Sequence, residues 1–308
     1  MKKINIAISS FGNIGRAILK IHQEHLAKFG KENDIHIVGV IRRNAGGKNT
    51  GIPAGIPVVS DVSALKVKPD VILCAGPSGH VKDDVKKFLN LGFNTVDCFD
   101  SHPKIIAYRE EIGKVARKNK TVSILSTGWD PGFDSVQRTL FAQLSPMGET
   151  FTTFGPGRSM GHTTEVKDIR GVRDAVSLTL PGKKPGMQKR LVYVVADKVE
   201  QKRIEREIKN HPYFVNDPTQ VKFVSSIAKF DTDKHQGHLV NRGTNVKVEI
   251  TLAGKNPVMT ANMMYASARA AFRAASESAF GCFTMVERPP LDFIKGDTVK
   301  ERLERVKY

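Results

Sequence analysis

The sequence predicts an α/β chain with a Rossmann-type, doubly wound parallel sheet, followed by a second α+β domain with an open, mostly antiparallel sheet. In the first half, short runs rich in Val and Ile alternate with helical patterns, which is typical of a parallel sheet covered on both faces. A glycine-containing turn follows the first run, at residues 9–16. After Pro131 the strand-like runs come with little helix between them, which indicates a change of architecture.

The first domain is expected over residues 1–127. Strands are predicted at 4–8, 35–41, 71–74, 94–96 and 122–125, and helices at 13–28, 80–90 and 105–118. The first of these helices carries Ile14, Ile18, Ile21 and Leu26 toward one face, a spacing suited to packing on a sheet.

The second domain is expected over residues 128–256. Its predicted strands are 190–196, 221–227 and 246–252, and one helix is predicted at about 199–209. A long helix rich in Ala and Met follows at 258–278. We expect this helix to pack back on the first domain, so that a segment of about 257–308 completes it.

Composition narrows the class of protein. A chain of 308 residues is long enough for two domains, and 40% hydrophobic with 26% charged residues is ordinary for a globular protein. No run of eighteen apolar residues is present, which excludes a membrane span. The three cysteines (Cys74, Cys98 and Cys282) are far apart and form neither a disulfide framework nor a metal signature, so a reducing cytoplasm is expected.

The formal net charge of +17 raises nucleic acid as a partner. Basic residues are mixed with acids at helical spacing, however, as in residues 198–207, and such pairs make a solvated helix face. No aromatic-basic surface motif accompanies them. We therefore expect no nucleic-acid partner and keep a nucleic-acid-binding protein as a remote alternative. A positive field also attracts a phosphorylated cofactor or a dicarboxylate.

The turn at residues 9–16 has the dinucleotide-binding pattern, with Ser10 in place of its first glycine. Gly12 lets the backbone approach a pyrophosphate, Gly15 permits close packing of helix on strand, and the helix N-terminus supplies donors. A tight strand-to-helix turn without a ligand is the structural alternative.

The second predicted strand ends at Arg42 and Arg43, with no acid for a ribose 2′-hydroxyl. Arginine accommodates a 2′-phosphate, so NADP is favoured over NAD. Two exposed loop arginines are the alternative. A third loop, residues 75–79, follows the next strand at the same edge of the sheet. The predicted cofactor-binding residues are Ser10, Phe11, Gly12, Asn13, Ile14, Arg42, Arg43, Cys74, Ala75, Gly76 and Ser78.

Acids follow two further strands. Asp97 and Asp100 follow the strand at 94–96, and Asp130 stands in the segment 126–135 beside Trp129, the single tryptophan. That segment contains too many turn residues to continue a strand or begin a regular helix. Each acid alone is a plausible cap or turn residue. Beside a nicotinamide site, strand-end carboxylates are suited to holding an ammonium or a water.

Five motifs occur in order: Gly-Asn-x-Gly-Arg, Thr-Val-Asp-x-Phe-Asp-x-His, Ser-Thr-Gly-Trp-Asp-Pro-Gly, Phe-Gly-Pro-Gly-x-Ser-Met-Gly-His and Gly-Cys-Phe-Thr-Met-x-Glu. From residue 4 to about 297 the chain resembles the meso-diaminopimelate D-dehydrogenases. The resemblance implies NADP-dependent, reversible oxidative deamination of the D-centre of meso-2,6-diaminopimelate. The products are ammonia and L-2-amino-6-oxopimelate, which cyclises to tetrahydrodipicolinate, a precursor of lysine and of cell-wall cross-links. It also implies a homodimer, with 128–256 as the substrate-binding and dimerisation domain.

The resemblance implies a role for individual residues. Asp100 and Asp130 are the catalytic residues at the ammonium of the D-centre, and no metal is required. Arg190 holds the carboxylate of the distal L-centre, and His235 is favoured over His238 as its neighbour. The full implied substrate-binding set is Trp129, Phe154, Met160, Gly161, Thr179, Arg190, His235, His238 and Asn256. Without the resemblance, Thr179 is equally suited to ending a helix and Arg190 to a solvated surface.

Two departures from the family pattern bear on substrate range. Phe154 and Met160 replace the Trp and Gln of some members, and the connection from 181 to 190 is short. Both features indicate the branch with a roomier substrate pocket. The alternatives that stay open are an NADP-dependent dehydrogenase of other D-amino acids and a related amino-acid reductase.

Overall fold

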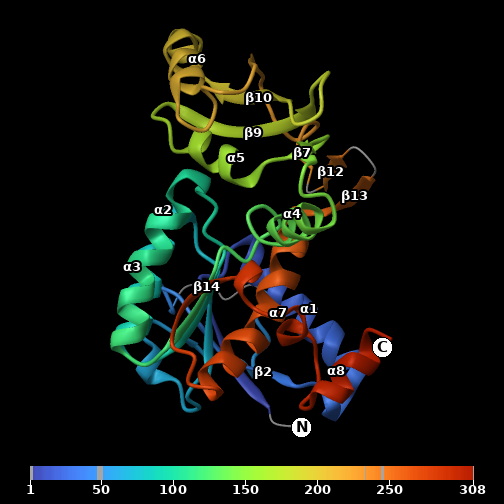
Figure 1. The fold of residues 1–308 in the computed structure, drawn as a ribbon. Coiled ribbons are helices and arrows are strands. Elements are labelled where there is room, and N and C mark those ends of the chain that lie inside the picture. Colours follow the sequence, from blue (N-terminus) through green and yellow to red (C-terminus); the bar gives the residue numbers. More distant parts are fainter. Residues whose placement is uncertain (1–2, 47–50, 233, 244–245, 308) are drawn as a thin grey trace. The chain divides into compact units, whose positions relative to one another are not determined.

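The structure is a computed structural model that describes residues 3–46, 51–232, 234–243 and 246–307 (Figure 1). The chain forms two compact units, 1–137 with 257–308, and 138–256. The first division falls inside helix α4 (Phe133–Leu144), later than the boundary expected at residue 127. The second falls at the start of helix α7 (Asn256–Ser276).

The first unit contains a seven-stranded sheet in the order β14-β6-β5-β4-β1-β2-β3, and every neighbouring pair in it is parallel. Its strands are β1 (Ile4–Ser9), β2 (Ile35–Ile41), β3 (Val58–Val59), β4 (Val71–Cys74), β5 (Asn94–Asp97), β6 (Val122–Leu125) and β14 (Gly281–Thr284). The strand order reverses between β1 and β4. In a doubly wound sheet, ligands bind at this switch point, outside the carboxyl ends of the strands.

Helices cover both faces of this sheet (Figure 1). Helices α1 (Asn13–Phe29) and α7 share one core with Ile6 and Ile8 of β1, whereas α2 (Ser78–Asn90) and α3 (Ile105–Lys118) share the other core with Ala7. Successive residues of β1 therefore point into opposite cores, and every residue of the strand except the half-buried Asn5 is buried, as in a strand covered on both faces. Because both faces of β1 are covered, apolar residues of the sequence point to both of them.

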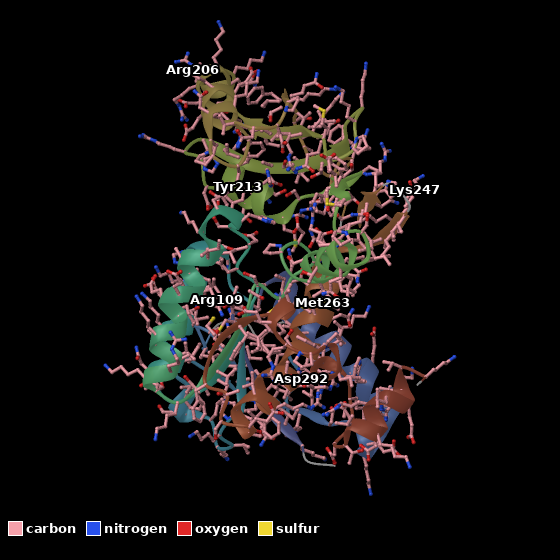
Figure 2. All side chains as sticks on the ribbon, viewed as in Figure 1. Arg109, Arg206, Tyr213, Lys247, Met263 and Asp292 are labelled. Atoms are coloured by element: carbon pink, nitrogen blue, oxygen red, sulfur yellow. The ribbon has the colours of Figure 1, made fainter. Side chains whose placement is uncertain are left out.

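The C-terminal segment belongs to the first unit. Strand β14 pairs with β6, and Arg269 of α7 forms a buried bidentate pair with Asp34 ahead of β2, at 2.7 and 2.8 Å. Arg109 of α3, labelled in Figure 2, donates from Nε to Glu287 at 2.9 Å. This hydrogen bond connects the residues after β14 to helix α3. The last helix is α8 (Val299–Arg305).

The described residues of the second unit form two sheets, where the sequence predicted a single open sheet. The four-stranded sheet has the order β11-β10-β9-β8, and the three-stranded antiparallel sheet has the order β13-β12-β7. The strands are β7 (Glu149–Phe154), β8 (Gly157–Arg158), β9 (Val172–Pro181), β10 (Gln188–Ala196), β11 (Thr219–Phe223), β12 (Lys234–Arg242) and β13 (Lys247–Lys255). The α/β plus α+β class expected from the sequence is confirmed, with the antiparallel part divided over two sheets.

Helix α6 (Gln201–Asn210) connects β10 to β11, and these two strands are parallel because a helical crossover returns the chain in the same direction. Ile204 and Ile208 of α6 pack on Val192 and Val194 of β10, in a core that also holds Val166 of α5 (Met160–Lys167). Among the described residues, no helix is long and apolar enough to cross a membrane.

The segment 126–135 does begin a helix, contrary to the expectation from its turn residues. Gly128 and Gly132 close a tight loop in which the Gly128 amide donates to Pro131 O at 3.0 Å and the Asp134 amide donates to Trp129 O at 2.8 Å. Gly132 has φ +136°, and a Cβ there would collide with Gly128. The turn residues thus shape a loop of five residues, and helix α4 starts directly after it, at Phe133.

Candidate active site

The turn between β1 and α1 is shaped for the close approach of a ligand. Ser10 has φ 73°, the left-handed conformation that the usual glycine adopts freely. A Cβ on Gly15 would lie 2.6 Å from Ser10 O, so the helix can pack here only with glycine. Among the residues that the structure describes, a Cβ on Gly12 would meet nothing within 4 Å, and no side chain caps the α1 N-terminus that follows. The turn therefore leaves an open approach to backbone N–H groups.

The other predicted cofactor-binding residues lie at the same edge of the sheet. Gly76, after β4, faces Ser10 across the switch point, because its Cβ would lie 3.2 Å from Ser10 Oγ. Arg42 and Arg43 directly follow β2, where Arg43 is exposed and Arg42 half-buried. Cys74 is the buried last residue of β4, and burial raises the pKa of its thiol well above the usual range.

Asp97, the last residue of β5, connects the loops that carry the two predicted catalytic acids. Its side chain is fully buried, and Oδ1 accepts from the amides of Phe99 and Ser126, both at 3.0 Å. Oδ2 accepts from the Tyr108 hydroxyl at 2.9 Å. The Asp97 carbonyl accepts from both the amide and the hydroxyl of Thr127 at 2.8 Å.

Burial raises the pKa of Asp97 to about 6, although its three hydrogen bonds act in the opposite direction. The sequence grouped Asp97 with the strand-end acids suited to holding an ammonium or a water, whereas its burial and its hydrogen bonds give it a positioning role. A signal was present in the motif Thr-Val-Asp, because an acid that ends an apolar strand is buried and needs partners. The partners themselves, from β6 and α3, are set by the tertiary fold.

Asp100 lies against Ser78, the first residue of helix α2, directly after the loop that follows β4. Ser78 Oγ donates to Asp100 Oδ1 at 2.5 Å, and the Asp100 amide donates to Ser78 Oγ at 3.1 Å. The structure thus brings together a residue predicted to bind the cofactor and a residue predicted to be catalytic.

Asp130 follows the buried indole of Trp129 and is half-buried. Its Oδ2 lies 3.5 Å from Nε2 of His102, an exposed residue on the loop that also carries Asp100. The β5 and β6 loops are therefore linked by this contact as well as by Asp97. The sequence motif contained His102 without indicating a partner for it.

In the second unit, Thr179 and Arg190 stand directly opposite each other on β9 and β10. Arg190 is 7% exposed, and its Nη1 donates to Thr179 Oγ1 at 2.5 Å. Its Nε donates to Asp217 at 2.6 Å. The structure excludes both structural alternatives, since Thr179 lies within a strand and Arg190 is buried. Asp217 had no assigned role, because it is distant in sequence from every motif.

His235 of β12 is buried, and its ring stacks on Phe154 of β7 with centroids 6.0 Å apart and planes 11° apart. Burial, together with the charge of Arg190, lowers the pKa of His235 to about 4, so its imidazole is neutral at neutral pH. His238 is exposed and, three residues further along the strand, points to the opposite face. The structure thus groups His235 with Phe154 and Arg190, and it leaves His238 outside this cluster.

Met160 and Gly161 begin helix α5, and both are half-buried. His162 follows them, and its Nδ1 lies 2.8 Å from Ser159 Oγ. The His162 ring packs edge-on against Tyr213, labelled in Figure 2, with centroids 5.1 Å apart. Burial and then the charge of Arg190 lower the pKa of His162 to about 3. Asn256 is the half-buried first residue of α7.

The parallel sheet with its switch point, the open turn at Gly12 and the carboxylates at neighbouring strand ends define the class: a dinucleotide-dependent oxidoreductase. Within the described part of the chain, no cluster of three or more His, Cys, Asp or Glu residues has a metal-binding arrangement.

Comparisons with known proteins give the family. The family model of the diaminopimelic acid dehydrogenase C-terminal domain matches residues 128–262. The meso-diaminopimelate D-dehydrogenase of Bacteroides fragilis is 40% identical over 306 residues, which cover 96% of this chain and 97% of that protein. The chain belongs to the meso-diaminopimelate D-dehydrogenase family, as its motifs indicated.

Solved structures agree in fold over the whole chain. The diaminopimelate dehydrogenase of Corynebacterium glutamicum in complex with diaminopimelate has a TM-score of 0.85 at 30% identity, covering 100% of both chains. An engineered D-amino acid dehydrogenase bound to NADP+ has a TM-score of 0.83 at 28% identity, again covering 100% of both chains.

Proposed function

We propose that this protein catalyses the NADP-dependent, reversible oxidative deamination of the D-centre of meso-2,6-diaminopimelate. The products are ammonia and L-2-amino-6-oxopimelate, which cyclises to tetrahydrodipicolinate. Family membership supports this reaction. The structural observation that carries it is the hydrogen bond between Ser78 and Asp100, because it joins the dinucleotide edge of the sheet to a strand-end carboxylate.

The residues present fit NADP. The open Gly12 turn and the uncapped N-terminus of α1 offer N–H groups to a pyrophosphate, and Arg42 and Arg43 suit a 2′-phosphate. A structural relative with NADP+ bound supports the same assignment. When bound, the nicotinamide accepts the hydride from the substrate Cα.

The chain itself supplies orientation and proton handling. Asp100 and Asp130 bind the ammonium of the D-centre, take up its proton so that the amine lone pair assists hydride loss, and then hold the water that attacks the substrate imine. Attack of that water on the imine carbon releases ammonia and leaves the carbonyl oxygen in the product. The Asp97 hydrogen bonds keep both loops in place throughout.

In the second unit, Arg190 and Thr179 bind the distal carboxylate, and the neutral imidazole of His235 hydrogen-bonds the distal end. Trp129, Phe154, Met160 and Gly161 contact the substrate carbons. Asn256 completes the set on the family resemblance alone, whereas His238, which points to the opposite face of β12, is left out of it. The same resemblance supports a homodimer, a cytoplasmic location, release of ammonia, and membership of the branch with the roomier pocket.

The reaction is tested by NADPH absorbance with the meso, L,L and D,D isomers of diaminopimelate and a panel of D-amino acids. Turnover of the meso and D,D isomers, but not the L,L isomer, is expected. Absence of turnover with the meso isomer would contradict the proposal. Activity confined to simple D-amino acids or to homoserine would instead support one of the alternative dehydrogenases.

Two variants separate the roles of the two units. Asp130→Asn is expected to lower kcat by about 10²-fold, because the amide cannot accept the ammonium proton. Arg190→Ala is expected to raise KM for meso-diaminopimelate by roughly 10²-fold with a smaller change in kcat, since it removes charge-assisted hydrogen bonds to a non-reacting group. Steady-state kinetics near wild type in both variants would refute these roles.

A further inference from the structure

A second carboxylate accompanies Arg190, the proposed ligand of the distal substrate carboxylate. Asp217 is held in a turn by its own backbone, whose amide donates to Phe214 O at 3.0 Å and whose carbonyl accepts from Thr219 Oγ1 at 2.9 Å. The Arg190 amide donates to Pro218 O at 2.9 Å. Strand pairing therefore fixes Asp217 beside the Arg190 guanidinium.

The hydrogen bonds that Arg190 makes with the described residues leave one end of its guanidinium available. A guanidinium has five N–H donors. Nε donates to Asp217 at 2.6 Å, and one donor of Nη1 is used by Thr179 at 2.5 Å. The other donors lie at the Nη1–Nη2 end, in the forked arrangement that a carboxylate accepts from. Asp217 thus orients Arg190 without blocking its end.

Besides orienting Arg190, Asp217 compensates the positive charge of its guanidinium. Burial lowers the pKa of Arg190, and the Asp217 carboxylate opposes that shift. The two imidazoles whose pKa values Arg190 lowers, His162 and His235, are neutral at neutral pH and add no charge. The Arg190–Asp217 pair therefore has a net charge near zero before any substrate binds.

We propose that Asp217 sets the charge preference of the distal subsite, an inference that rests on the proposed function. With Asp217 present, a substrate carboxylate joins an already compensated pair and is repelled by a neighbouring anion. A side chain without a carboxylate leaves no uncompensated buried charge, so it is tolerated. Asp217 thereby weakens selection for dicarboxylates and extends the substrate class to D-amino acids with apolar side chains.

The test is Asp217→Asn, which keeps an oxygen acceptor for Arg190 Nε and removes the charge. Binding of D-2-aminopimelate and D-2-aminoheptanoate, which differ only in the distal carboxylate, is measured by calorimetry with saturating NADPH and no ammonia, so that no oxidation occurs. The variant is expected to bind D-2-aminopimelate roughly tenfold more tightly. Its affinity for D-2-aminoheptanoate is expected to stay equal or fall.

Asp174→Asn is the matched control, because Asp174 pairs at 2.7 Å with Lys167 on an exposed surface of the same unit. The ratio of the affinities of Asp174→Asn for D-2-aminopimelate and D-2-aminoheptanoate should equal that of the wild-type protein. Thr179→Val separates orientation from charge: it removes a tether of Arg190 but no charge, and is expected to weaken D-2-aminopimelate binding. Asp217→Ser, also uncharged, replaces Asp217→Asn if thermal unfolding shows that variant to be unfolded.

An unchanged or smaller preference for D-2-aminopimelate in Asp217→Asn overturns the proposal, as does undetectable binding of this ligand to both proteins. The readout does not depend on turnover. If wild-type protein fails to oxidise meso-diaminopimelate but Asp217→Asn still shifts the affinity ratio, the proposed function fails while the role of Asp217 stands.

Discussion

Ser10 occupies the turn position where the dinucleotide-binding pattern has its first glycine, and it adopts the glycine conformation, φ 73°. A left-handed conformation costs a residue with a Cβ about 1 kcal/mol. Replacement by glycine removes this cost. Glycine loses more conformational entropy on folding, however, so only part of the cost appears as a gain in stability. The fold therefore imposes this backbone shape on a residue that does not favour it.

Ser10→Gly is expected to raise the free energy of unfolding by about 0.5 kcal/mol, as measured by urea denaturation, and to tighten NADPH binding slightly. Ser10→Ala is the control, because alanine keeps the Cβ and removes only the hydroxyl. Equal stabilisation by both substitutions would show that the backbone conformation of Ser10 is not the cause.

Asp97 shows how one buried acid positions the two loops that carry the proposed catalytic acids. In Asp97→Asn, the amide oxygen still accepts from Phe99 and Ser126, and the amide nitrogen donates to Tyr108, whose hydroxyl also accepts. In Asp97→Ala, all three donors lose their partner. Displacement of catalytic groups by about 1 Å costs about 10²-fold in rate.

We therefore expect Asp97→Ala to lower kcat/KM by about 10²-fold, whereas Asp97→Asn stays within about tenfold of wild type. Steady-state kinetics with meso-diaminopimelate measure both, and thermal unfolding confirms that each variant is folded. Equal loss in the two variants would show that the charge, and not the positioning of the loops, is what matters.

At the scale of elements, the sequence predicts best where apolar runs and turn residues coincide. Strands β2, β4 and β6 and helix α3 have the predicted bounds. Mostly aliphatic residues fill the buried positions of the three strands up to the turn that ends each one, and Tyr108, Ile112 and Ala116 give α3 a buried face. Strand β12 was missed because its first two buried positions hold His235 and Gly237, so no hydrophobic alternation is visible.

The residues of the candidate site likewise fall into those that local sequence patterns indicate and those that they do not. Ser10, Gly12, Asp100 and Asp130 follow strand ends and could be identified from local patterns. The positioning role of Asp97 and any role of Asp217 could not be predicted, since both depend on partners that only the folded chain brings near. Helices α4, α5 and α8 were also missed; α5 buries only Thr163 and Val166 and so lacks a clear apolar face.

A buried ion pair between Arg269 and Asp34 connects helix α7 to the residue ahead of β2. Arg269 and Asp34 have side chains that are each 5% exposed, with contacts of 2.7 and 2.8 Å. The pair lowers the pKa of Asp34 even though burial, the largest single influence, raises it. Loss of one partner leaves a buried charge without compensation.

Arg269→Met is expected to lower the free energy of unfolding by about 3 kcal/mol, measured by urea denaturation at neutral pH. The control is Glu304→Gln, which removes an exposed helix pair with Lys300 and should change stability by no more than about 0.5 kcal/mol. A loss below 1 kcal/mol in Arg269→Met would contradict the role assigned to this pair.

For the whole molecule, buried histidines determine how stability depends on pH. Burial is the largest cause in each case, and it lowers the pKa of His22 and His235 to about 4 and that of His162 to about 3. An unfolded histidine takes up a proton near pH 6.5. Between pH 6.5 and these lower values, protons therefore bind the unfolded chain and favour unfolding.

Protonation of Asp97 stabilises the folded protein within part of that pH range, opposite to the effect of the histidines. Its pKa of about 6 in the folded protein exceeds the unfolded value, so its contribution to stability is full below about pH 4 and is lost as the pH rises through 6. On going from pH 7 to about pH 5, each histidine removes roughly 2 kcal/mol, and Asp97 returns roughly 1 kcal/mol. The histidines prevail.

The protein is therefore expected to lose on the order of 5 kcal/mol of stability between pH 7 and about pH 5, a large part of the total for an ordinary domain. Urea denaturation at the two pH values measures this loss. His162→Gln removes one titrating group and is expected to reduce the loss by roughly 2 kcal/mol, whatever its effect on absolute stability. A wild-type protein equally stable at both pH values, or an unchanged loss in the variant, would show that these histidines are protonated in the folded protein.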